Sequence, residues 1–152
     1  MSHLSMLTTL CKIEINCCPA LVDVSCLCDV PDLSFFGCSG LTDITALGKA
    51  RRLSIRKCKN VKAFNFQSIL YLNTDLLVED SPAISSMKTR NLAVEGYRPC
   101  TLQIPSLRTL MISSSRIATT AYYSNLFEIE LEYCNEISHL DGLRNVAVVK
   151  VM

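Results

Sequence analysis

The sequence predicts a mostly β solenoid of the α/β class: a right-handed coil with one curved parallel sheet and little or no helix on its convex side. Three observations predict it. A unit of about twenty residues recurs along the chain, no sustained helical period separates the recurrences, and hydrophobic residues make up 49% of the 152 residues. A fixed period of this length is typical of repeat architectures. The hydrophobic content and a net charge of only +1 also exclude intrinsic disorder.

The repeat is clearest in three segments that begin at Ile13, Leu33 and Leu53, 20 residues apart. They share the frame L-x-L-x-x-C-x-x-L, and in the first two the frame continues as x-D-L-x-x-L. The two aspartates, Asp23 and Asp43, are expected to bond loop backbone. Later units are expected to start at Leu76, Leu92, Leu110, Ile129 and Val149. Residues 1–152 therefore read as one domain of about seven repeats plus partial terminal repeats.

Each L-x-L segment is expected to be a short strand. Because successive side chains of a strand point to opposite faces, the two apolar residues face inward and the middle residue faces outward. One coil cannot bury its apolar face alone, whereas stacked neighbours can. A doubly wound α/β domain is the alternative, but it needs helices between its strands. The gaps of about fourteen residues hold no sustained 3.6-residue period, so we expect extended chain or single 3₁₀ turns there.

The units resemble leucine-rich repeats, whose frame is L-x-x-L-x-L-x-x-N/C-x-L. Residues Val30 to Cys38 and Leu126 to Cys134 carry the frame, and the resemblance covers nearly the whole chain, although its second half degrades over residues 76–128. The resemblance is specific for the fold and almost silent on function. It implies a buried ladder residue at the N/C position that bonds neighbouring backbone amides. That role falls here to Cys18, Cys38, Cys58 and Cys134.

Nine cysteines cannot all pair internally. The chain has neither a basic secretory leader nor the roughly 18 consecutive apolar residues of a membrane span. We therefore expect an intracellular, cytoplasmic protein whose thiols stay reduced and behave as small buried apolar side chains. No C-x-x-C half-site is present, so neither a metal nor another cofactor is expected.

The chain carries no motif for phosphate binding, dinucleotide binding, a nucleophile elbow or a zinc protease. A cysteine hydrolase using Cys134 and His139 is one alternative. However, a catalytic thiol needs exposure and a lowered pKa, and Cys134 occupies the expected ladder position. We therefore expect a protein that is not an enzyme.

Solenoids bind partners on their concave surface, where two charged groups are expected. The basic block comprises Arg51, Arg52, Arg56, Lys57, Lys59 and Lys62, and the acidic block comprises Glu128, Glu130, Glu132 and Glu136. An apolar stretch at Leu77, Ala93 and Met111 lies between them. The expected partner-binding residues are Arg52, Arg56, Lys57, Phe36, Leu77, Met111, Glu128, Glu130 and Glu132. The alternative is that both blocks are simply solvated.

These features favour a non-catalytic protein-interaction scaffold, a subunit of a larger protein or nucleoprotein assembly. Repeat arrays normally end in polar capping repeats, and none is visible before Leu4 or at Val151. Other subunits are therefore expected at both solenoid ends as well as on the concave face, unless the chain is a fragment. Two alternatives remain: the recognition module of an immune-receptor-like or F-box-like ubiquitin-ligase adaptor, and an RNA contact at the basic block. The RNA contact is disfavoured because the block lacks interleaved aromatic residues.

Overall fold

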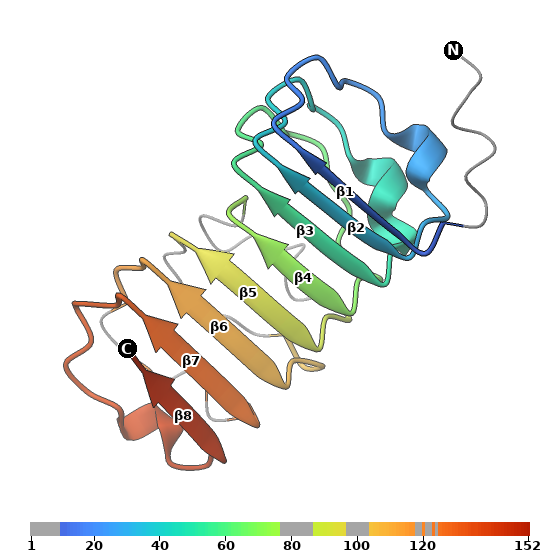
Figure 1. Ribbon diagram of the computed structural model, residues 1–152. Helices are drawn as coiled ribbons and strands as arrows, with labels where there is room; N and C mark the ends of the chain where they lie inside the picture. The colour runs from blue at the N-terminus through green and yellow to red at the C-terminus, as the bar shows by residue number, and fades with distance from the viewer. Residues whose placement is uncertain (1–9, 77–86, 97–103, 118–119, 121–122, 124) are drawn as a thin grey trace. The chain divides into compact units, whose positions relative to one another are not determined.

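A computed structural model of the chain describes residues 10–76, 87–96, 104–117, 120, 123 and 125–152. The chain divides into two compact units, Met1–Leu76 and Leu77–Met152, and each is a parallel β-solenoid with very little helix (Figure 1). The first unit contains β1 (Lys12–Asn16), β2 (Asp32–Phe36), β3 (Arg52–Arg56) and β4 (Tyr71–Thr74). The second unit contains β5 (Asn91–Glu95), β6 (Thr109–Ser113), β7 (Glu128–Glu132) and β8 (Val148–Val151).

Within each unit the strands pair in parallel and in the order of the sequence. Phe35 of β2 pairs with Ile15 of β1 on one side and with Ile55 of β3 on the other, which confirms the predicted 20-residue coil. In the second unit Leu110 of β6 pairs with Leu92 of β5 and with Ile129 of β7. Each step of about twenty residues therefore brings the chain back to the same place, one strand further along.

The core of each unit is the column of inward side chains behind its strands. Phe35, Ile55, Ile112 and Leu131 are completely buried, and burial alternates along the strands as the L-x-L pattern predicts. Burying each such side chain contributes about 1.5–3 kcal/mol. The inward residues therefore supply the free energy that keeps the coils stacked.

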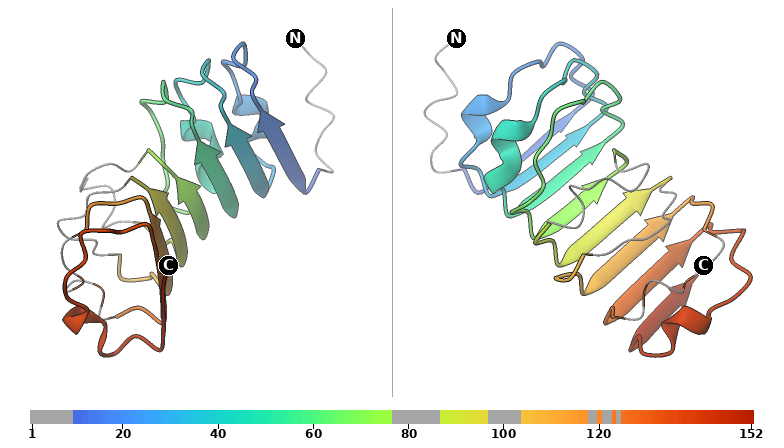
Figure 2. Two further views of the ribbon diagram at one scale, coloured as in Figure 1. Left: turned by 60° about the vertical axis from the view of Figure 1, so that its left-hand side comes forward. Right: turned by 180° about the vertical axis from the view of Figure 1, so that it is seen from behind.

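The return leg of the coil is closed by short 3₁₀ turns at Ser25–Leu27, Thr45–Lys49 and Asp141–Leu143, on the opposite side of the coil from the strands (Figure 2). The predicted role of the two aspartates is confirmed. The amide of Ser25 donates to Asp23 Oδ1 at 2.8 Å. The amide and hydroxyl of Thr45 donate to Asp43 Oδ1 at 2.8 and 2.7 Å. The carboxylates thus hold the start of each turn.

The turn that follows a strand has a recurrent left-handed residue. The φ angle lies between 53° and 71° at Cys17, Gly37, Lys57, Gly96, Ser114 and Tyr133, which directly follow β1, β2, β3, β5, β6 and β7. At most of these positions the amide donates to the last carbonyl of the next strand, as from Cys17 to Phe36 at 2.7 Å. Only two of the six are glycine, so four residues adopt a conformation that L side chains disfavour.

The fourth repeat does not start where the sequence pattern predicted. The strand expected from Leu76 is wrong: β4 spans Tyr71–Thr74, and Leu76 follows it. The second inward position of β4 holds Thr74, which is fully buried and whose hydroxyl oxygen accepts from the amide of Leu76 at 3.0 Å. A hydroxyl satisfied in this way can replace an aliphatic side chain, and the apolar frame misses it. Leu77 lies outside the described residues.

Candidate interaction faces

The outward side of the strands forms an open face in each unit. We define the first face as the outward residues of β1–β4 and the second face as the outward residues of β5–β8. On β2 to β7 these side chains are half-buried or exposed while their inward neighbours are buried. On the terminal strands the inward residues are less covered: those of β1 are half-buried and those of β8 are exposed. Among the described segments, the 3₁₀ turns lie on the opposite side of the strands (Figure 2). Each face is therefore available for contacts.

Arg52, the first residue of β3, is held on the first face by residues of the two neighbouring strands. Its Nε lies 3.9 Å from Oδ1 of Asp32 on β2. Its guanidinium carbon lies 4.4 Å from the ring centroid of Tyr71 on β4. The register places Asp32, Arg52 and Tyr71 side by side, so the positive charge of Arg52 is already shared with an acid and an aromatic ring.

Phe36 and Lys57 make a second cation–aromatic pair where β2 and β3 end. Lys57 Nζ lies 5.2 Å from the centroid of the Phe36 ring, and Arg56 pairs with Phe36 in the register. The amide of Lys57 donates to Oδ2 of Asp75 at 2.8 Å. A carboxylate takes the place of the backbone carbonyl that accepts this bond in the other turns.

The basic block does not form one patch. Arg52 and Arg56 lie on the first face and Lys57 lies at its edge, whereas Arg51 precedes β3 and Lys59 and Lys62 lie beyond the turn. Arg52 and Arg56 are four residues apart on one strand, about 13 Å. The block has no interleaved aromatic residue in the sequence, but neighbouring strands supply two, since Phe36 and Tyr71 lie against its cations.

The second face carries an excess of negative charge. Its outward residues include Glu95, Glu128, Glu130 and Glu132 against the single cation Lys150, a formal charge of −3. Lys150 Nζ lies 2.8 Å from Glu128 Oε1 and 3.7 Å from Glu130 Oε2. The hydrogen bond to Glu128 and the charges of both glutamates raise the pKa of Lys150. Lys150 thus offsets part of the mutual repulsion between Glu128 and Glu130.

The apolar centre of the second face is Met111. The register places it between Ala93 on β5 and Glu130 on β7, and its side chain is half-buried. Leu77, the third residue of the predicted apolar stretch, lies outside the described residues. Ala93 and Met111 are therefore the part of that stretch that the structure places on the second face.

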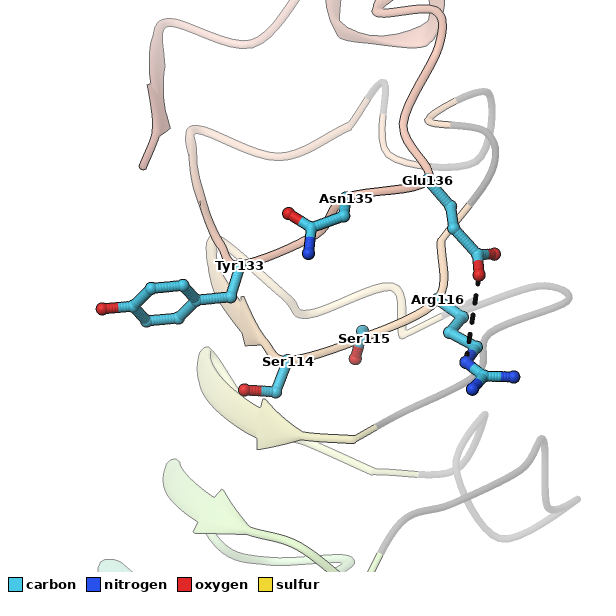
Figure 3. Close-up of a pocket in the computed structure, with 6 residues that line it drawn as sticks. All are labelled: Ser114, Ser115, Arg116, Tyr133, Asn135 and Glu136. Atoms are coloured by element: carbon cyan, nitrogen blue, oxygen red, sulfur yellow. Dashed lines mark ion pairs between the residues drawn. The ribbon is translucent and has the colours of Figure 1, made fainter.

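A shallow polar hollow lies beyond the ends of β6 and β7 (Figure 3). It has a volume of about 360 Å³ and is lined by Ser114, Ser115, Arg116, Tyr133, Asn135 and Glu136. Arg116 Nε lies 3.9 Å from Glu136 Oε1 across it, while the Tyr133 ring points away.

The ladder cysteines occupy equivalent positions, two residues beyond a strand. Cys38 and Cys58 are fully buried, Cys134 is half-buried and Cys18 is exposed. The resemblance implied bonds to backbone amides, and the amides of Ser115 and Cys38 do bond Cys134 and Cys58. The thiols also donate to carbonyl oxygens, as Cys134 does to Ile112 and Glu132 at 3.6 and 3.4 Å. Ser115 fills the same position after β6 and donates to Ser113 at 3.4 Å. The expectation that the thiols are buried is also wrong for Cys11, Cys17, Cys18 and Cys26.

The geometry of Cys134 disfavours the hydrolase alternative. Burial raises the pKa of its thiol, whereas a nucleophilic cysteine needs a lowered pKa. The backbone carbonyl of His139 accepts a hydrogen bond from Thr120 Oγ1 at 3.2 Å, which fixes the loop that carries this residue. The thiol therefore acts as a donor inside the coil.

Sequence reasoning missed Tyr71 and Asn73 on the first face because it started the fourth repeat too late. The spacing of the repeats could have identified the fourth strand. Starting the fourth strand pair at Leu72 gives steps of 19 residues from Leu53 and 20 residues to Leu92, which are closer to the twenty-residue period than the steps through Leu76. Three residues of the acidic block lie on one side of β7, as predicted, since Glu128, Glu130 and Glu132 alternate with buried neighbours. Glu136 lies beyond the strand and pairs with Arg116 instead.

The fold and the open faces define the class of this protein: a repeat protein built as a parallel β-solenoid. Comparisons with family models, curated proteins and solved structures gave no match. Within the described ranges, no helix is long and apolar enough to cross a membrane. The same residues contain no group of three or more His, Cys, Asp or Glu side chains placed to hold a metal ion.

Proposed function

We propose that this protein is a non-catalytic, leucine-rich-repeat-like scaffold that binds other proteins through its open strand faces, as a subunit of a larger protein or nucleoprotein assembly. The observation that carries the proposal is the pair of open faces, on which outward side chains stand in register on neighbouring strands. Strand spacing of about 4.8 Å sets these side chains at a regular interval. Such a surface suits an extended or helical protein segment.

The second face favours a basic segment as its partner. Its charge of −3 attracts Lys and Arg side chains, and Met111 with Ala93 offers an apolar contact among the acids. Lys150 pairs with Glu128 and Glu130, whereas Glu132 lies beyond them, at the end of β7. A partner cation is therefore best placed near Glu132.

The first face favours protein over RNA as the partner. Arg52 and Lys57 lie over the rings of Tyr71 and Phe36, where a stacked base would otherwise sit. Asp32 beside Arg52 would also repel a phosphate backbone. We therefore expect no tight binding of a single-stranded RNA at physiological salt, which a fluorescence anisotropy titration measures.

The test of the scaffold function is quantitative affinity capture with a charge-reversed second face. The variant Glu130→Lys with Glu132→Lys is expected to lose the proteins that the natural chain retains. Asp141→Lys is the control, because Asp141 lies in a 3₁₀ turn away from the face and pairs only with the exposed Arg144 among the described residues. Equal sets of proteins on all three baits, each with the same unfolding midpoint, would contradict the proposal.

A further inference from the structure

Three cysteines form a column in the first unit. Cys18, Cys38 and Cys58 each lie two residues beyond the end of β1, β2 and β3. The register keeps them level, since Asn16 pairs with Phe36 and Phe36 with Arg56. Paired strands lie about 4.8 Å apart. A disulfide needs Cα atoms about 4.4–6.8 Å apart, so the backbone places neighbouring members of this column within reach of each other.

The thiols of Cys18 and Cys38 converge on the end of the same strand. Cys38 Sγ lies 3.6 Å from the carbonyl oxygen of Ile15, a residue of the preceding coil. Cys18 Sγ lies 3.4 Å from the carbonyl oxygen of Asn16. Ile15 and Asn16 are consecutive residues of β1, so two thiols from successive coils bond neighbouring carbonyls.

The coils are held in register beyond the strands as well. The amide of Cys17 donates to the carbonyl of Phe36 at 2.7 Å. Cys17 lies beside Gly37 of the next coil, and its Sγ is 3.5 Å from the position that a Cβ on Gly37 would take. Of the two adjacent cysteines, Cys18 is therefore the one level with Cys38.

Accessibility differs along the column. Cys18 is exposed, whereas Cys38 and Cys58 are fully buried. Burial also raises the pKa of Cys58, which keeps this thiol protonated and a poor nucleophile. A dissolved oxidant therefore meets Cys18 first, and the buried thiol that reaches toward that coil is Cys38.

We propose that Cys18 and Cys38 are a redox-sensitive pair that closes a disulfide between the first and second coils when a small-molecule disulfide oxidises Cys18. The Cys18 thiolate attacks one sulfur of the oxidant RSSR, which releases RS⁻ and leaves a mixed disulfide. The Cys38 thiol gives its proton to RS⁻ and attacks the Cys18 sulfur, which expels the second thiolate, protonated by water. Overall, two protein thiols and RSSR become one protein disulfide and two RSH. The bond ties the first coil to the second.

The experiment uses the full chain, oxidised glutathione and a protease that cleaves before aspartate. Cleavage separates residues 1–22, which contain Cys18, from residues 32–42, which contain only Cys38, and from residues 43–74, which contain only Cys58. After free thiols are alkylated, mass spectrometry is expected to show residues 1–22 joined to residues 32–42 with the loss of two hydrogens. Dithiothreitol is expected to reverse the link.

Two serine variants identify the cysteine within residues 1–22. The link is expected to persist in Cys17→Ser and to disappear in Cys18→Ser. A link that survives in Cys18→Ser, a link from residues 32–42 to residues 43–74, or a glutathione adduct on Cys18 without any link would each overturn the proposal. Unreacted thiols at both positions after exposure to the oxidant would overturn it too.

Discussion

Strands β3 and β7 belong to different units and carry opposite outward charge on the same inward frame. Both bury an aliphatic pair, Leu53 with Ile55 and Ile129 with Leu131. Outward, β3 presents Arg-Ser-Arg and β7 presents Glu-Glu-Glu. The comparison teaches that the inward positions specify the coil, while the outward positions are free to define a binding surface.

Residues on neighbouring strands offset the outward positive charge of β3 and the outward negative charge of β7 in different ways. On the first face Glu14 and Asp32 offset two of the three outward cations, Lys12, Arg52 and Arg56, and leave a formal charge of +1. Lys150 contacts Glu128 and Glu130 but leaves the second face at −3. Each unit therefore has its own core built on the same inward frame, and the two units differ in the partner chemistry that they offer.

The largest predicted effect contrasts two adjacent phenylalanines of β2. Phe35 is fully buried, and Phe35→Ala should lower the free energy of unfolding by about 3–5 kcal/mol. Phe36 faces outward under Lys57, so Phe36→Ala should lower it by only about 0.5–1 kcal/mol. Urea denaturation measures both values. Similar losses for the two variants would break the division into inward and outward positions.

A second prediction concerns the close approach of successive coils at Gly40. A Cβ added there would lie 2.3 Å from the carbonyl oxygen of Pro19 and 2.6 Å from that of Leu21. Because both contacts are backbone, Gly40→Ala should destabilise the first unit by about 1–3 kcal/mol. Gly48→Ala, whose nearest contact would be 3.0 Å, is the milder control. A neutral Gly40→Ala would show that these coils are more widely spaced.

The left-handed turns give a smaller pair of effects with opposite sign. Gly96 has φ +71° and open space around its Cα, so Gly96→Ala reports backbone strain alone and should cost about 1 kcal/mol. Ser114 has φ 53° one coil further on, and Ser114→Gly should raise stability by less than about 1 kcal/mol. Thermal unfolding of both variants measures the two shifts, and shifts of the same sign would contradict the shared turn geometry.

The fold could be predicted from the sequence only where the residue types themselves mark a strand or a turn. Apolar pairs such as Leu33 with Phe35 predicted the strands and their register. The fourth strand was missed because a polar residue, Thr74, occupies one of its inward positions. The burial of Thr74 depends on a local hydrogen bond, which hydrophobicity does not reveal. The left-handed turns were also invisible, since Lys57 and Tyr133 occupy positions where glycine would have been the signal.

The candidate faces were harder to predict than the fold. A run of charged residues in the sequence identifies candidate surface residues but not their contacts. The partners of Arg52 could be identified only from the register of β2, β3 and β4. Tyr71 was missed with the fourth strand. The compensation of Glu128 and Glu130 by Lys150 required knowing that β7 pairs with β8.

The smallest predicted effect depends on pH. The hydrogen bond from the Thr45 amide, followed by that from its hydroxyl, lowers the pKa of Asp43 below its ordinary value of 3.8. A carboxylate with a lowered folded-state pKa stabilises the fold above its unfolded pKa and loses that contribution as the pH falls through the folded value. Asp43→Ala should therefore be less stable than the natural chain at pH 7, with a difference that shrinks below pH 3.8. A difference that grows in acid would contradict this role.

The most direct measurement of the central claim places the outward residues of β3 on the inward frame of β7. The variant Glu128→Arg, Glu130→Ser, Glu132→Arg leaves Ile129 and Leu131 untouched. If inward residues alone specify the coil, its free energy of unfolding in urea should stay within about 1 kcal/mol of the natural value. A loss as large as that of Phe35→Ala would show that the outward side chains help to specify the coil.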